Sequence, residues 1–324
     1  MASRQHGPIR SSIQPSRMFV GGGVRRRNAS GSGEGSHSWK EIRDWLTVII
    51  PPTTLVTALG FWFGYSFTNA RVHELGIDAS VLELSTTDYL VRSADPVIAP
   101  AAIVLALLLG VLGLHALVDP LIQSRSGARV VRLGCSVSFI AGSLGVLSGI
   151  RLMFVHLPGL HYLVPPALLA GGAACAGYGF YLLRTMKRLS GPLIDSSTIP
   201  LWEKGGYVIV VFLVIVGLFW GTTEYAEALG RGRAQDTERG LQSLTSVKVF
   251  SKQSLALADP SLGVLETRIT ASNSAYLFQY TGLRLVLRSA DKFFLFPEKW
   301  TRTTGRAIVL EDNSDIRLEL SPGK

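Results

Sequence analysis

Three polar side chains within a single short stretch, Asp88, Tyr89 and Arg92, are the best candidates for a binding site in this chain. A carboxylate, a phenol and a guanidinium together offer hydrogen-bond donors and acceptors to a ligand or a protein partner. Asp88 and Arg92 also have the i,i+4 spacing of an ion pair on a helix. The same residues allow a structural interpretation, because Asp88 follows Ser85 at the spacing of a capping box.

The segment around them, 71–96, separates two long apolar blocks and carries five acids and two bases. Asp78 and Ser85 are each placed to begin a short helix. Apolar residues such as Leu82 and Leu84 follow and would not remain in water. We expect two short helices that lie at the membrane surface with their apolar sides down and pack on the helical bundle. If the segment is only a structural cap, its charged side chains contribute little. If it is a binding site, the same side chains form the docking surface for a ligand or partner.

Residues that could perform catalysis or bind a metal do not form a recognisable group. The two cysteines, Cys135 and Cys175, lie in separate apolar blocks, and no histidine or cysteine occurs after residue 225. Most metal sites and Cys-His or Ser-His nucleophiles need those residue types. The glycine-rich stretches "GGGVRRR" and "GRGRAQ" fit neither a P-loop nor a dinucleotide fingerprint. The sequence therefore predicts no metal and no cofactor, and it leaves enzymatic activity without a candidate site.

Long apolar blocks dominate the chain, which is 47% hydrophobic and only 17% charged. Each block has about 20 residues, the length that a helix needs to cross a bilayer. The sequence predicts an α-helical multi-pass membrane protein with about five transmembrane helices in a domain at 38–225. The predicted spans are 46–70, 97–118, 133–155, 163–183 and 207–225.

The distribution of Lys and Arg predicts the orientation of these spans. Segment 1–45 has eight such residues, 119–132 has three and 184–206 has four, whereas the opposite short loops hold only Arg71, Arg92 and Arg151. We expect a cell-membrane protein with a cytoplasmic N-terminus, a disordered basic tail at 1–37 and an extracytoplasmic C-terminus. The net charge of +9 then favours anionic lipid headgroups over nucleic acid as a partner.

Small residues recur within three of the spans and predict close helix contacts. We interpret these stripes as packing within one chain, and the alternative is a homo-oligomer interface. The residues are Gly60 and Gly64, then Ala141, Gly145 and Gly149, then Gly171, Cys175 and Gly179.

The C-terminal region, 226–324, has a different pattern. Residues 226–244 are helix-friendly but contain Gly230 and Gly232, and they predict an interrupted stalk. Short alternating runs follow, from "VKVF" through "LETRIT", "AYLFQY", "LRLVLRS", "KFFLFP" and "RAIVLE" to "DIRLEL", with "SADK" as a hairpin turn. The sequence predicts a small, mostly-β extramembrane domain.

One stretch is "FGYSFTNARVHELGIDASVLELSTTDYLVRSAD", and a second region holds "YTGLRLVLRSADKFFLFPEKW" and "IRLELSPG"; together they make up about a fifth of the chain. These stretches resemble a group of uncharacterised bacterial multi-pass membrane proteins. The resemblance implies a bacterial membrane protein. It implies no activity, so it assigns no role to any residue.

These patterns favour a non-enzymatic membrane protein that senses, binds or scaffolds through its outer loop and β domain. A transport or channel subunit is the first alternative, although the spans have almost no ionisable residue at mid-depth. A membrane-embedded enzyme is the second. The partners we expect are the lipid bilayer and either a protein partner or further copies of the chain.

Overall fold

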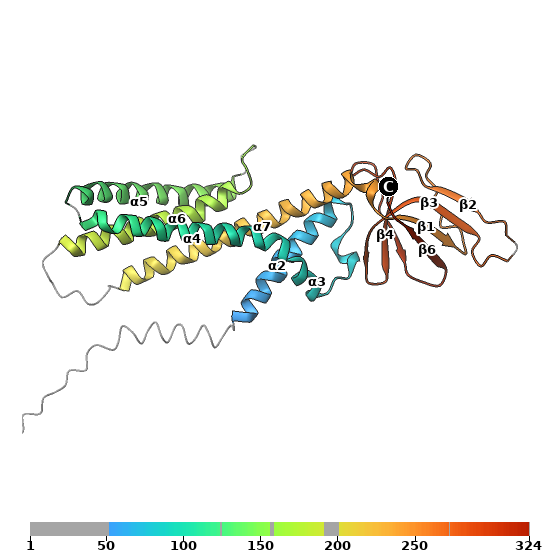
Figure 1. Cartoon of the computed structure of the whole chain (residues 1–324), viewed down its shortest axis with the longest axis horizontal. Helices are drawn as coiled ribbons and strands as arrows, with labels where there is room; N and C mark the ends of the chain where they lie inside the picture. Colours follow the sequence, from blue (N-terminus) through green and yellow to red (C-terminus); the bar gives the residue numbers. More distant parts are fainter. Residues whose placement is uncertain (1–51, 124, 156–158, 191–200, 272, 324) are drawn as a thin grey trace, which may run out of the picture. The chain divides into compact units, whose positions relative to one another are not determined.

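The computed structural model describes residues 52–123, 125–155, 159–190, 201–271 and 273–323. The predicted tail at 1–37 and the beginning of the first apolar block lie outside these residues. All described residues belong to one unit, Ile50–Lys324, in which long helices precede an antiparallel sheet (Figure 1).

One long helix covers each of the last four predicted spans, and α2 covers the described part of the first. Each of these helices extends past its apolar block at one end or both. They are α2 (Pro52–Glu74), α4 (Ala94–Gln123), α5 (Arg125–Phe154), α6 (Val164–Ser190) and α7 (Leu201–Arg239). Four of the described helices are long and apolar enough to cross a membrane: Ala94–Val118, Arg129–Phe154, Val164–Met186 and Gly205–Arg239. They expose many large apolar side chains, as lipid-covered surfaces do.

The helices α5 and α6 lie side by side and make the most extensive helix contact of the described chain (Figure 1). Glycines allow their backbones to touch. A Cβ atom at Gly142 would lie 2.5 Å from the Ala176 nitrogen, and one at Gly172 would lie 2.7 Å from the Gly142 oxygen. Together with Gly145 and Gly149, Gly142 gives a three-four spacing, which keeps one face of a helix toward its neighbour.

The predicted small-residue stripes are therefore correct in part. Gly145, Gly149 and Gly179 do face the partner helix closely. Ala141, Gly171 and Cys175 are exposed instead. A repeat of four residues advances about 400° around a helix with 3.6 residues per turn, so a four-residue stripe drifts off the contact face. The other two predicted packing glycines, Gly60 and Gly64, contact a short helix rather than another span.

Two adjacent glycines make this assignment testable. Gly172→Leu should destabilise the solubilised protein by at least about 1–3 kcal/mol, because the new side chain meets backbone on α5. Gly171→Leu should leave the melting temperature nearly unchanged, because a Cβ atom there meets nothing within 4 Å. Equal shifts in the two melting curves would contradict the seam described for α5 and α6.

The last long helix, α7, continues past the apolar block into the predicted stalk. Its 39 residues extend about 58 Å at a rise of 1.5 Å per residue, nearly twice the hydrocarbon thickness of about 30 Å. The predicted interruption at Gly230 and Gly232 is wrong, because the helix runs through both. Gly230 instead permits close contact with α2: its Cβ would lie 2.3 Å from the Phe67 oxygen.

The C-terminal strands form one antiparallel sheet in the order β5-β4-β3-β1-β6. The strands are β1 (Ser246–Ser251), β2 (Leu265–Arg268), β3 (Phe278–Ser289), β4 (Lys292–Pro297), β5 (Ile308–Glu311) and β6 (Ile316–Ser321). The strand β2 pairs with the first part of β3, and β4 pairs with the second part along the same edge. This sheet confirms the predicted β region.

Two predicted strands, "AYLFQY" and "LRLVLRS", are fused into the single long strand β3. Gly282 lies between them with φ +83°, and a Cβ there would lie 1.9 Å from the Gly263 oxygen. Only glycine satisfies both conditions, and it marks the point where β3 changes partner from β2 to β4. The predicted "SADK" hairpin is confirmed, with Ser289 paired to Lys292.

Candidate functional site: the helix–sheet junction

The segment 71–96, which we call the outer segment after its place in the predicted topology, forms the two short helices that its capping residues predict. The 3-10 helix η1 (Ala79–Leu82) begins at Asp78, whose carboxylate accepts from the Ser80 nitrogen at 2.8 Å. The helix α3 (Thr86–Arg92) begins with a complete capping box between Ser85 and Asp88. Bonds from the Ser85 hydroxyl and then its backbone N–H hold the pKa of Asp88 below its ordinary value.

The three predicted binding residues do not converge on one point. Asp88 turns back to Ser85, with its carboxylate 2.6 Å from the hydroxyl oxygen. Tyr89 is buried against α2, where its ring meets Phe61 edge-on at 5.4 Å between centroids. Arg92 is half-exposed, and among the described ion pairs none joins it to Asp88. Two of the three side chains thus hold α3 in place, which fits the structural interpretation of this segment.

The backbone of α3 explains the first glycine pair. A Cβ at Gly64 would lie 1.8 Å from the Tyr89 oxygen, and one at Gly60 would lie 3.1 Å from the Leu90 side chain. The "GFWFG" motif therefore lets the short helix α3 dock on α2.

The apolar side of η1 faces protein rather than a membrane surface. Leu82 is fully buried in a core that joins the end of α2, the outer segment, α7 and the sheet, whereas Val91 on α3 is 72% exposed. We name this cluster the junction core. Its buried members are Val72, Leu75, Ile77, Leu82, Ala234, Leu241, Phe294, Phe296 and Trp300.

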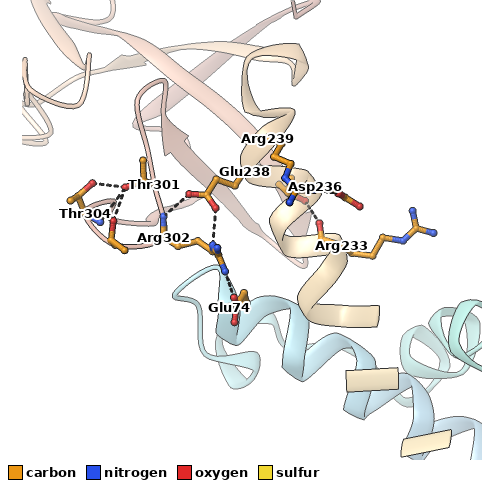
Figure 2. A network of polar contacts seen from close by, with 10 residues as sticks. Glu74, Arg233, Asp236, Glu238, Arg239, Thr301, Arg302 and Thr304 are labelled. Carbon is orange, nitrogen blue, oxygen red and sulfur yellow. Dashed lines mark hydrogen bonds and ion pairs between the residues drawn. The ribbon is translucent and has the colours of Figure 1, made fainter. Parts of the chain in front are cut away.

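Beside the junction core, Arg302 links both helices to the sheet (Figure 2). Its guanidinium contacts the carboxylate of Glu74 at the end of α2. Its Nε donates to Glu238 near the end of α7 at 2.7 Å, and its backbone N–H donates to the same carboxylate at 3.1 Å. We name these contacts the Arg302 clamp.

Further polar contacts attach the sheet to the same elements. Arg284, nearly buried on β3, donates to the Leu244 carbonyl at 3.2 Å and to Glu298 at 2.7 Å. On the β3–β4 hairpin, Ser289 donates to the Leu82 carbonyl at 2.5 Å, and Lys292 pairs with Glu83 at 2.6 Å. The outer segment is consequently bonded to the sheet as well as packed on it.

A cavity in the sheet domain lies close in sequence to the Arg302 clamp. It has a volume of about 310 Å³, at the lower end of the range of about 300–1,000 Å³ for small-ligand sites. Apolar side chains line it, and the Asp259–Arg306 ion pair of 3.3 Å contributes its charged groups. We name it the β-domain pocket. Its lining includes Leu257, Leu262, Val264, Ile308 and Leu310.

One loop, 298–307, connects the clamp with the pocket. Trp300 is stacked on Phe296 at 4.2 Å between ring centroids inside the junction core. Arg302 then holds the two helices, and Arg306 lines the pocket four residues later. One loop therefore contributes residues both to the clamp and to the pocket.

The contacts of Arg302 with Glu74 and Glu238 could not be predicted from the sequence. Arg302 is 228 residues from Glu74 and 64 from Glu238 in the chain, and single charges on a polar loop resemble any solvated surface. Apolar residues in "GIDASVLEL" and "KFFLFP" did signal burial, but nothing in either pattern indicated that they bury each other.

Within the described ranges, no three His, Cys, Asp or Glu side chains form a group that could hold a metal ion. Comparison of the chain with protein-family models, with curated proteins and with solved structures finds no match. The junction and the pocket are therefore the features of the molecule that bear on its function.

Burial in the junction core predicts a contrast between two apolar residues of the outer segment. Leu82→Ala should destabilise the protein by about 2–5 kcal/mol, because it removes a fully buried side chain. Val91→Ala should change stability by less than about 0.5 kcal/mol, since Val91 is mostly exposed. Chemical denaturation followed by tryptophan fluorescence measures both. Comparable losses would place Leu82 outside the core that fixes the sheet.

The clamp also predicts a pH dependence. Hydrogen bonds from Arg302, chiefly its backbone N–H, lower the pKa of Glu238 from its ordinary 4.5. Because the pKa of Glu238 is lower in the folded state, the ionised carboxylate stabilises the clamp. This stabilisation is complete when the pH is above the ordinary pKa, and it is lost as the pH falls through the lower pKa of the folded state. Hydrogen exchange at the Arg302 amide, corrected for intrinsic rates, should accelerate in that window. Glu238→Gln should remove the pH dependence, and a wild-type amide insensitive to acid would count against the clamp.

Proposed function

We propose that this chain is a five-span cell-membrane protein with a cytoplasmic N-terminus and an extracytoplasmic sheet domain. The four apolar helices α4 to α7 support the membrane assignment. The fifth span would be the block at 46–70, of which α2 is the described part. The Lys and Arg bias of the short segments supports the orientation.

Its proposed activity is non-enzymatic: the sheet domain binds a ligand or partner, and the helices receive the signal. The observation that carries this proposal is the Arg302 clamp, which ties the loop bordering the β-domain pocket to α2 and α7 together. A binding domain that merely needed to stay near the membrane would require only a flexible linker. Here the pocket, the loop and the two helix ends form one connected structure.

The pocket is suited to an apolar group with a polar end. Leucine and isoleucine side chains would cover the apolar part, and Arg306 or Asp259 would meet the polar part. Arg306 is 80% exposed along its side chain, so it can leave Asp259 without a large cost in burial. An occupant that recruits Arg306 would shift the loop that also holds Arg302.

A pocket substitution tests this connection. Leu257→Trp should partly fill the pocket, displace loop 298–307 and accelerate hydrogen exchange at the ends of α2 and α7. Arg302→Gln should accelerate exchange at the same helix ends without touching the pocket. The matched control is Arg317→Gln, which removes an exposed pair with Glu319 on β6 and should leave the helix ends unchanged. Effects of Leu257→Trp confined to the pocket would contradict signal transfer.

Topology has its own test. In a background without Cys135 and Cys175, single cysteines replacing Ser126 and Ser196 should resist a membrane-impermeant thiol reagent in whole cells. A cysteine replacing Ser314, exposed between β5 and β6, should react. The reversed labelling pattern would place the sheet domain in the cytoplasm.

A further inference from the structure

An apolar groove opens between three of the candidate spans. Side chains of α4, α6 and α7 line it, and its volume is about 280 Å³. Almost all of its surface is carbon, apart from Thr222 and Tyr225 on α7. The groove includes Pro100, Leu107, Ala167, Gly171 and Gly217.

Gly171 shapes this groove. It is exposed, and a Cβ atom added there would meet nothing within 4 Å, whereas its neighbour Gly172 is in contact with α5. The absent side chain leaves room at the groove rather than at the helix seam.

Three arginines on α2, α3 and α7 lie farther along the chain from the groove, toward the sheet domain. Arg233 on α7 pairs with Asp95 in the first turn of α4 at 3.3 Å. Arg71 lies on α2 where that helix touches α7, since a Cβ at Gly230 would be 3.1 Å from its nitrogen. Arg92 ends α3, just before α4 begins. The charges of Arg92, Arg233 and Asp95 all act on Arg71, so the three arginines and one carboxylate form a group with a positive excess.

The environment of Arg71 is unfavourable for its charge. Its Nε is buried and has no hydrogen-bond partner among the described residues. Burial, followed by the charges of Arg92 and Arg233, lowers the pKa of Arg71 from its ordinary value. Arginine nevertheless remains charged in proteins, so a bound anion would relieve both the desolvation and the repulsion.

The helix rise places the arginines beyond the end of the groove that is nearer the sheet domain. Along α4, Pro100 follows Asp95 by five residues, or about 7.5 Å, and along α7 Tyr225 precedes Arg233 by eight, or about 12 Å. The arginines therefore stand at headgroup depth when the groove lies in the hydrocarbon, because the headgroup layer adds about 5–7 Å on each side of the bilayer.

We propose that this site binds one anionic phospholipid from the leaflet on the side of the sheet domain. One acyl chain lies in the groove between α4, α6 and α7, and the phosphate is bound by Arg71, Arg92 and Arg233. An anionic lipid has a negative headgroup and an apolar chain, which match the positive arginines and the apolar groove. One guanidinium group can donate two parallel hydrogen bonds to two oxygens of a phosphate. The site is independent of the β-domain pocket.

Native mass spectrometry of the delipidated full chain in detergent tests the proposal. Dioleoyl phosphatidylglycerol should give more bound lipid than dioleoyl phosphatidylcholine at equal concentration. Arg92→Gln and Arg71→Gln should each weaken phosphatidylglycerol binding about fivefold, the usual contribution of one basic residue near an anionic lipid. The matched control Arg239→Gln lies on α7 but pairs only with Asp236 among the described ion pairs, and it should bind as the wild type.

Groove variants separate chain binding from headgroup binding. Gly171→Leu and, as a second filling variant, Leu107→Trp should reduce binding of both lipids, and free glycerol phosphate should not compete. Melting curves confirm that each variant is folded. Equal binding of the two lipids, or wild-type binding by Arg92→Gln, would overturn the arginine site. If the protein without lipid forms dimers and Gly171→Leu dissociates them, the groove holds a helix of a second copy instead of a lipid.

Discussion

The junction core is the contact on which the rest of this structure depends. Leu82 of the outer segment, Ala234 of α7 and Phe296 of β4 are each fully buried there. None of these three elements could bury its apolar residues alone: η1 has only four residues, and one face of the sheet would otherwise meet water. The sheet domain is therefore built on the ends of two long helices, and its stability and its position have the same physical cause.

Polar contacts make this arrangement specific. Apolar packing alone tolerates rotation and sliding, but the Arg302 clamp fixes the ends of α2 and α7 at a defined separation, because one planar guanidinium meets both carboxylates. Arg284 on β3 fixes the start of loop 298–307 in the same way, because its guanidinium pairs with Glu298. The clamp groups are partly exposed, so their energetic contribution is modest, and their main effect is on geometry.

Local features of the molecule were predictable from the sequence. Apolar block lengths located the long helices, the Ser85–Asp88 spacing located α3, and alternation located the strands, because all three depend on neighbours within a few residues. Long-range features were not. Whether a residue of a four-residue stripe lies at the α5–α6 seam depends on which face of its helix the partner helix covers. Gly172 lies at the seam, whereas its neighbour Gly171 does not. The meeting of Arg302 with Glu74 depends on the complete fold, and no local pattern encodes it.

The junction core and the Arg302 clamp hold the sheet domain in a fixed position on α7, which a flexible tether would not do. Distance measurement between spin labels in reconstituted bilayers tests this most directly, with one label at Val211, exposed on α7, and one at Ser314, exposed beside β6. A fixed junction predicts a single narrow distance distribution that broadens when Arg302 and Leu82 are replaced together. A broad distribution in the unaltered protein would show that the sheet domain is only tethered to α7.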